Sequence, residues 1–101
     1  MGFNLLLRSE VEEDLEQAIG WYESKSPGLG KRFFTSFEET LSKIMQHPEH
    51  YRYITKPVRR CVISKFPYAI HYLQTDNTIL VLGVIHRNRS NAFKKKRFRQ
   101  R

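Results

Sequence analysis

The spacing of apolar residues changes from helical to strand-like partway along this chain of 101 residues. Before Pro48, apolar side chains recur every three or four residues in two stretches, which are joined by a turn rich in Pro and Gly at residues 25–30. Farther on, β-branched and aromatic residues dominate three runs, at residues 58–65, 68–75 and 78–86. This order predicts a helical layer followed by a sheet, in one α+β domain.

The two helical stretches have recognisable ends. The first helix is predicted to begin at a capping-box pattern formed by Ser9 and Glu12 and to continue to about Ser24. The second is predicted to stop near His47, because a proline disfavours the helical conformation in the residue before it. Their apolar stripes consist of Val11, Leu15, Ala18, Ile19 and Tyr22 in the first helix, and Leu29, Phe33, Phe37, Leu41, Ile44 and Met45 in the second.

The sheet is predicted to contain four strands. A short apolar segment at residues 3–8 precedes the helices, and residues 75–78 form a hairpin turn between the last two strands. Residues 79–85 are apolar at both alternating positions, which predicts a central strand covered on both faces. Gly83 within it indicates a bulge or a close backbone approach.

The expected fold is therefore α+β, in the order β-α-α-β-β-β, with an N-terminal helical hairpin packed on one face of a mainly antiparallel sheet. Residues 3–93 are expected to form a single domain, and residues 94–101 a basic C-terminal tail. The sequence leaves two alternatives for that tail, a helix or a disordered segment, and Phe93 and Phe98 are the residues that could dock it.

The composition argues against several classes of protein. No apolar run approaches the roughly 20 residues needed to span a bilayer, and acidic residues follow the N-terminus too soon for a secretory signal peptide. The single cysteine, Cys61, lies in an apolar strand pattern and predicts a buried thiol. These features predict a cytoplasmic protein with no membrane association. No cluster of Cys, His and Asp has the spacing of a metal site, and no motif indicates a cofactor.

Charge is divided unevenly along the chain. Residues 1–49 contain five Lys/Arg and nine Asp/Glu, a net charge of −4, whereas residues 50–101 contain 13 Lys/Arg and one acid, a net charge of +12. Residues 87–101 contain eight Lys/Arg and no acid. This segregation favours binding of a polyanion or an acidic protein, and a solvated tail that only aids solubility is the alternative.

Arginines gather where the last predicted strand leaves the sheet. Arg87 and Arg89 follow that strand, while Arg59 and Arg60 lie on the first of three adjacent strands and point to opposite faces. We expect one of these two to join Arg87 and Arg89 on a sheet face that the helices leave uncovered. Guanidinium groups bind phosphates or carboxylates through paired hydrogen bonds. A solvated sheet edge is the alternative.

Histidines supply the remaining candidate groups. If the large aromatic residues of the 68–75 run face the helices, His71 points to the opposite face of the sheet. A partly buried histidine with satisfied hydrogen bonds is one interpretation, and a role in the site is the other, since that face is not obviously filled. His86 immediately precedes Arg87 at the end of the last strand.

Several short motifs occur in a characteristic order: Arg8-Ser9-Glu10-Val11-Glu12-Glu13-Asp14-Leu15, Ala18-Ile19-Gly20-Trp21-Tyr22, Ser26-Pro27-Gly28-Leu29-Gly30, His47-Pro48, Val58-Arg59-Arg60, Phe66-Pro67-Tyr68 and Val84-Ile85-His86-Arg87. Each is weak alone, but together they resemble the RelE/ParE toxins, often called plasmid stabilisation proteins. The resemblance covers roughly residues 3–93 and is closer to ParE-like members. It implies the same β-α-α-β-β-β fold and the toxin component of a type II toxin–antitoxin system.

The resemblance also implies two possible activities. RelE-like members cleave messenger RNA in the ribosome with basic residues and a late tyrosine, whereas ParE-like members bind and block DNA gyrase without catalysis. Of the positions used for cleavage, Arg60 and Arg87 carry over, but Val62, Ala69 and Phe93 replace a lysine, an arginine and the tyrosine. A phenylalanine cannot transfer a proton, and general acid–base catalysis contributes about 10²–10⁴-fold to a rate.

We therefore expect a non-catalytic toxin that binds DNA gyrase. A ribosome-dependent mRNA endonuclease with an altered active site, using Arg60, Arg87 and His86, is the first alternative, and a non-toxic nucleic-acid-binding module is the second. The resemblance further implies an antitoxin that wraps the toxin with an amphipathic helix and often adds a strand to the sheet, and the net charge of +12 on residues 50–101 predicts that this partner is acidic. The residues expected to contact the target or the antitoxin are Arg59, Arg60, His71, His86, Arg87 and Arg89.

Overall fold

A computed structural model describes residues 2–99 and contains the predicted order of elements with three additions. The predicted elements are β1 (Asn4–Leu7), α1 (Ser9–Lys25), α2 (Leu29–Gln46), β3 (Val58–Val62), β4 (Tyr68–Thr75) and β5 (Thr78–His86). A 3-10 turn, η1 (Pro48–His50), leads into the additional short strand β2 (Tyr53–Thr55), and the chain continues into the additional helix α3 (Asn91–Phe98). The α+β class and the β-α-α-β-β-β core are thus confirmed.

The five strands form one sheet in the order β1-β5-β4-β3-β2. Only β1 pairs in parallel, with β5, and the other pairs are antiparallel. As predicted, β5 is a central strand, and residues 81–85 within it are buried. Gly83 lies opposite His71 and Val81 lies opposite Tyr72, so Leu82 is an extra residue that forms the expected bulge.

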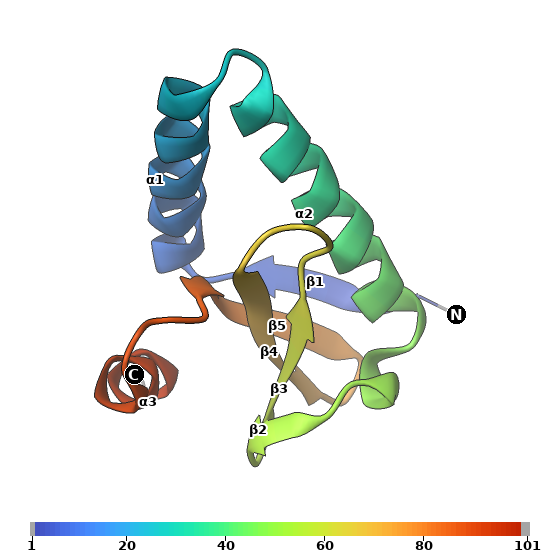
Figure 1. Cartoon of the computed structure of the whole chain (residues 1–101). Helices are drawn as coiled ribbons and strands as arrows, with labels where there is room; N and C mark the ends of the chain where they lie inside the picture. The colour runs from blue at the N-terminus through green and yellow to red at the C-terminus, as the bar shows by residue number, and fades with distance from the viewer. Residues whose placement is uncertain (1, 100–101) are drawn as a thin grey trace.

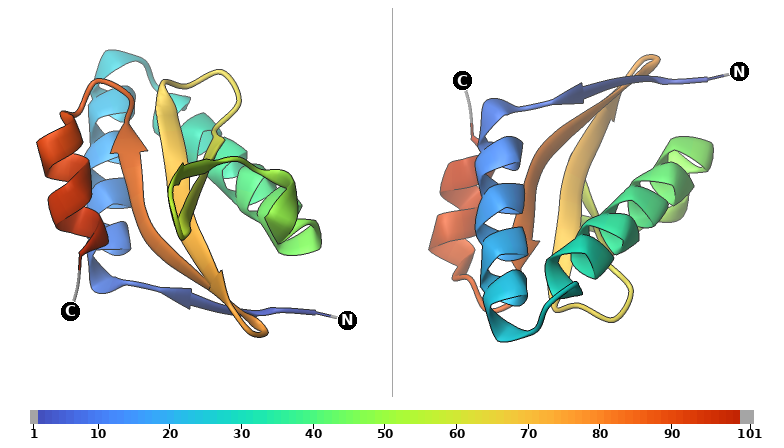
Figure 2. Two further views of the ribbon diagram at one scale, coloured as in Figure 1. Left: turned by 90° about the horizontal axis from the view of Figure 1, so that it is seen from below. Right: turned by 90° about the horizontal axis from the view of Figure 1, so that it is seen from above.

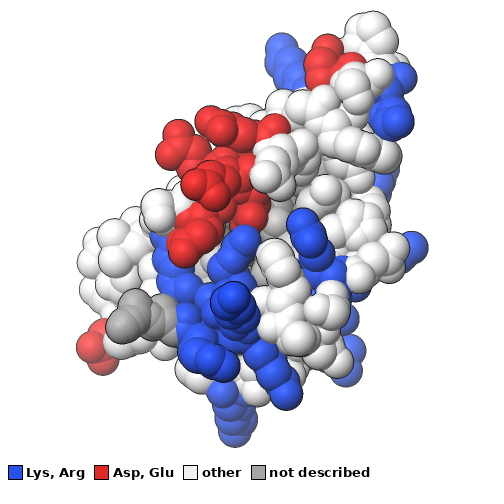
Figure 3. Space-filling model, turned by 90° about the vertical axis from the view of Figure 1, so that its left-hand side faces the viewer, with Lys and Arg blue, Asp and Glu red and all other residues white. Residues whose placement is uncertain are grey.

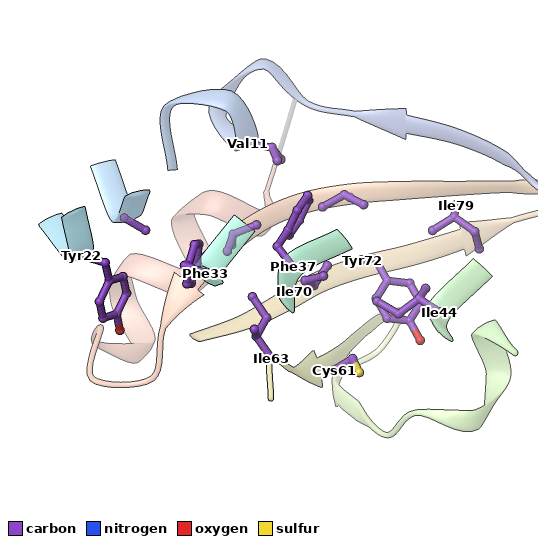
Figure 4. Packing of buried hydrophobic residues seen from close by; sticks show 13 residues of the cluster. Val11, Tyr22, Phe33, Phe37, Ile44, Cys61, Ile63, Ile70, Tyr72 and Ile79 are labelled. Carbon is purple, nitrogen blue, oxygen red and sulfur yellow. The ribbon is translucent and has the colours of Figure 1, made fainter. Parts of the chain in front are cut away.

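Helices α1 and α2 cover one face of this sheet, as Figure 1 shows. Between the helices and the sheet lies a core of buried apolar side chains, drawn in Figure 4, in which Phe33, Ile44, Ile70 and Tyr72 are fully buried. Cys61 also belongs to this core and is only 8% exposed, which confirms the predicted buried thiol. Burial raises the pKa of this thiol above its usual value.

The helical hairpin turns through Gly28, whose φ of 86° lies in the left-handed region that favours glycine. Two oxygens of Glu23 accept the N–H groups of Gly28 and Gly30, which fastens the start of α2 to α1. Helix α2 ends at Gln46, as predicted. The predicted capping box was wrong, because the residue that caps α1 is Arg8 and no side chain there accepts a capping hydrogen bond.

Helix α3 runs beside α1 at the edge of β5, as both views in Figure 2 show. The domain boundary expected at residue 93 therefore falls inside a helix. Residues 100 and 101, the end of the expected basic tail, lie outside the described residues. Among the described residues, no helix is long and apolar enough to cross a membrane.

Candidate functional site

Asp14 and Arg97 join α1 to α3 through a two-pronged ion pair. Nη1 of Arg97 donates to Oδ2 of Asp14 at 2.7 Å, and Nη2 donates to Oδ1 at 3.0 Å. Both side chains are only 14% exposed. Oδ2 of Asp14 also accepts the backbone N–H of Val84 at 2.9 Å, where β1 no longer pairs with β5. The hydrogen bonds that Arg97 donates to Asp14 raise the pKa of Arg97, and the pair fixes α3 on the sheet.

The absence of a side chain at Gly83 makes room for this ion pair. A Cβ atom at this position would lie 2.6 Å from Nη1 of Arg97, closer than non-bonded atoms approach. A second arginine holds the last turn of α3, because Nη1 of Arg8 donates to the carbonyl oxygen of Arg97 at 2.7 Å. The end of α3 is therefore held by Arg8, between β1 and α1, and by Asp14 in α1.

The connection between β5 and α3 is also ordered by hydrogen bonds. The backbone N–H of Arg87 donates to the carbonyl of Pro67 at 2.9 Å, and that of Arg89 donates to the carbonyl of His86 at 3.0 Å. Nδ1 of His86 accepts the backbone N–H of Asn88 at 3.0 Å. The exposed side chains of Arg87 and Arg89 thus project from a defined turn.

Phe93, in the first turn of α3, is in contact with two guanidinium groups. The Cζ atom of Arg89 lies 4.4 Å from the centre of its ring, and that of Arg97 lies 5.4 Å from it. Ser90 caps the helix by accepting the backbone N–H of Phe93 at 3.0 Å. The phenyl ring therefore lies against the guanidinium groups of Arg89 and Arg97 at the start of α3.

A cleft of about 430 Å³ separates α1 from α3 above the end of β5. Five of its twelve lining residues carry aromatic rings, and Trp21, the single tryptophan of the chain, borders it with 56% of its surface exposed. Arg89 also lines this cleft. The cleft therefore suits an apolar or aromatic group that lies next to an anion. The rings that line it are Trp21, Tyr22, Tyr68, His86 and Phe93.

His71 points away from α1 and α2, as predicted, but α3 covers it. Its ring lies 5.3 Å from that of Phe98, only 1% of the residue is exposed, and neither ring nitrogen has a hydrogen-bond partner among the described residues. Burial lowers its pKa to about 4. The expectation that this sheet face is uncovered was therefore wrong at His71. The face remains open at β3, where Val62 is 61% exposed.

The two arginines of β3 have different surroundings. Nη1 of Arg59 donates to the carbonyl of Tyr51 at 2.6 Å, and its Nη2 donates to the hydroxyl of Tyr53 at 2.9 Å, so Arg59 holds the segment before β3. Arg60 lies opposite His71 and lines a second, more open cleft of about 540 Å³. Lys43 and Arg52 line that cleft as well.

The structure separates Arg60 from Arg87. Val62 of β3 lies opposite Ala69 of β4, and Ala69 lies opposite Ile85 of β5. Strands β3 and β5 run in the same direction, Arg60 comes two residues before Val62, and Arg87 comes two residues after Ile85. Arg87 is therefore four residues farther along the sheet than Arg60 and two strands away. At strand spacings this amounts to about 13 Å along the sheet and about 10 Å across it. The expectation of a single three-arginine cluster was wrong, and of its members only Arg87 and Arg89 come together with His86.

Sequence reasoning missed the Asp14–Arg97 pair and the cleft beside it. The partners of that pair are 83 positions apart, and no local pattern connects them. Gly83 carried a partial signal, because a glycine in a central strand indicates a close approach. Within residues 2–99, no group of three or more His, Cys, Asp or Glu side chains is placed to hold a metal ion.

Comparison with known proteins identifies the family. Residues 5–91 match the family described as "ParE toxin of type II toxin-antitoxin system, parDE". The chain is 30% identical over 83 residues to Toxin ParE2 of Mycobacterium tuberculosis, in both strain CDC 1551 / Oshkosh and strain ATCC 25618 / H37Rv. That match covers 81% of this chain and 79% of the relative.

A solved structure has the same fold. A chain of the "Chromosomal ParDE TA system from P. aeruginosa" matches with a TM-score of 0.74 and 14% sequence identity, over 83% of this chain and 95% of that one. The fold, the family match over most of the chain and the curated relatives agree. This chain belongs to the ParE toxin family of type II toxin–antitoxin systems.

Proposed function

We propose that this toxin acts in the cytoplasm by binding DNA gyrase and blocking it, without catalysing a reaction. The surroundings of Phe93 carry this proposal, because the ring packs against Arg89 and Arg97 where a ribonuclease of the superfamily would need a group that transfers protons. A phenyl ring can neither donate nor accept a proton. His71 cannot replace it while it lies under α3, because only 1% of the residue is exposed and a substrate cannot reach it.

The surface proposed to contact the target or the antitoxin consists of His86, Arg87, Arg89 and the adjacent cleft. Arg87 and Arg89 are exposed and can form paired hydrogen bonds with carboxylates. The cleft beside them offers an aromatic lining to an apolar anchor residue. An acidic protein segment with one large apolar side chain fits this combination, and an antitoxin is the partner that a type II system requires.

Induced expression tests the proposed target. Uptake of labelled thymidine, uridine and leucine is measured after induction, alone and together with the small antitoxin gene expected beside the toxin gene. DNA synthesis is expected to fail first, and the antitoxin should restore growth. If protein synthesis fails first and messenger RNA is cut at ribosomes, the toxin is an endonuclease and the gyrase proposal is wrong.

A pair of variants tests the proposed surface. Arg87→Ala with Arg89→Ala should weaken growth inhibition and antitoxin binding at least tenfold, because charge-assisted hydrogen bonds are lost. Lys31→Ala with Arg32→Ala, two exposed positions at the start of α2, serves as the control with the same loss of charge. If the two pairs of substitutions have equal effects, His86, Arg87 and Arg89 do not belong to the surface that contacts the target or the antitoxin.

A further inference from the structure

The outward side of α3 and the turn before it carry a run of positive charges. Phe93, Lys94, Arg97 and Phe98 form the inner side of the helix and are buried or partly buried. The exposed side carries Lys95 and Lys96, followed by Arg99 just past the helix, and the exposed Arg87 and Arg89 precede it. We call these five residues the α3 cationic face: Arg87, Arg89, Lys95, Lys96 and Arg99.

Internal contacts hold the α3 cationic face in place. The Asp14–Arg97 ion pair, the contact between Phe98 and His71 and the Ser90 cap together fix α3 against the sheet. Within residues 2–99, no carboxylate forms an ion pair with any of the five cations. Helix α3 is therefore held against the sheet, and the charges on its outward side remain available to an external anion.

We infer that the α3 cationic face binds the phosphate backbone of duplex DNA. This goes beyond the proposed function and does not depend on which enzyme the toxin inhibits. The exposed positions of α3 and the preceding turn are Arg, Asn, Lys, one Ser and one Ala. Interfaces with DNA are polar and strongly positive, with Arg, Lys and Asn in contact with phosphates.

The composition of α3 itself disfavours a protein partner on the helix, beyond the surface at Arg87 and Arg89 that the proposed function assigns to the target or the antitoxin. Protein interfaces place aromatic and apolar residues at their centre and are depleted in lysine. The only apolar exposed position on α3 is Ala92. A single strand is also disfavoured, because proteins that bind single strands stack bases on aromatic side chains and the exposed positions of α3 carry none.

The acidic residues of α1 set a limit to the DNA site. Figure 3 shows the acidic patch directly beside the basic one, on the same side of the molecule. The exposed acids of this helix include Glu10, Glu12, Glu13 and Glu16. They repel a duplex that approaches over α1, so the duplex is expected to lie along α3 and to leave the aromatic cleft accessible to a protein.

A binding assay tests the inference. The probe is a fluorescein-labelled 20-base-pair duplex, and its anisotropy is measured with the whole chain at 50 to 200 mM KCl. Five phosphate contacts predict that log K falls with log salt at a slope of about −4.5. Lys95→Glu with Lys96→Glu should reduce the steepness of that slope by about two and weaken binding at least tenfold. Lys31→Glu with Arg32→Glu changes the net charge equally at a distant site and should alter binding less than threefold.

A neutral pair, Lys95→Gln with Lys96→Gln, serves as a further control. It removes the two positive charges without introducing glutamates that the acidic residues of α1 would repel. It should give an intermediate loss of affinity with an unchanged thermal unfolding midpoint. Three outcomes would each overturn the inference. The first is an equal loss of affinity in the α3 pair and the α2 pair of variants. The second is single-stranded DNA that binds as tightly as the duplex. The third is poly-glutamate that, at equal charge, displaces the labelled duplex as well as unlabelled duplex does. The last outcome would indicate a site for acidic protein segments.

Discussion

At the scale of single residues, Asp14 links three parts of the fold. Its carboxylate accepts hydrogen bonds from Arg97 in α3 and from the backbone of Val84 in β5. Because removal of one partner leaves a buried charge unpaired, Asp14→Ala should lower the free energy of unfolding by about 3 kcal/mol. Glu16→Ala, an exposed change on the same helix, should stay within about 0.5 kcal/mol. Urea denaturation measures both, and equal effects would contradict the role given to Asp14.

Gly83 and Arg97 form a second test at this scale. A methyl group at Gly83 would displace the guanidinium of Arg97 from its position beside the strand. Gly83→Ala should therefore destabilise the protein by about 1–3 kcal/mol. In an Arg97→Ala background, Gly83→Ala should lower the free energy of unfolding much less, because the guanidinium that the methyl group would meet is absent. Additive effects in the double variant would show that the two positions are not coupled.

His71 predicts how stability depends on pH. Its pKa is about 4 in the folded protein and near 6.5 in an unfolded chain, so the unfolded state binds the proton more readily. The contribution of His71 to the free energy of unfolding is therefore complete above pH 6.5 and decreases as the pH is lowered towards 4. The loss amounts to about 3 kcal/mol at pH 4. Urea midpoints between pH 7.5 and 4 measure this. His71→Leu should lose this part of the pH dependence, and an unchanged profile in that variant would assign the effect to other groups.

At the scale of elements, the sequence predicted the helical hairpin and the four main strands, because their apolar residues repeat with the helical or strand period. It did not predict β2, which has three residues and is too short to show an alternating pattern. It also left the state of the basic tail open. The docking of α3 depends on Asp14, far away in the sequence, and no local pattern contains that information.

The two helices of the hairpin offer a matched pair of glycine changes. A Cβ atom at Gly30 would lie 2.7 Å from the carbonyl oxygen of Ile19, whereas one at Gly20 would meet nothing within 4 Å. Gly30→Ala should push α2 away from α1 and destabilise the protein by about 1–3 kcal/mol. Gly20→Ala, within α1, should stabilise it by about 0.5–1 kcal/mol. Thermal unfolding measures both, and similar effects would contradict the close approach at Gly30.

At the scale of the whole molecule, charge segregation along the sequence becomes segregation in space. The acids of α1 and the cations of α3 form adjoining patches, which Figure 3 shows. The sequence predicted the contents of the basic region and located Arg87 and Arg89 correctly at the end of β5. It could not predict that Arg60 lies far from them or that α3 covers His71, because both depend on strand register and on tertiary docking.

The most direct test of the account is a supercoiling assay with purified DNA gyrase, relaxed plasmid and ATP at 150 mM potassium glutamate. Added toxin should inhibit supercoiling, and the Arg87→Ala, Arg89→Ala variant should inhibit at least tenfold less. Relaxation of the negatively supercoiled form of this plasmid by a type I topoisomerase should continue at those toxin concentrations, which separates gyrase inhibition from coating of the DNA. Undiminished supercoiling at a large excess of toxin, with messenger RNA cut in a translating extract, would contradict the account.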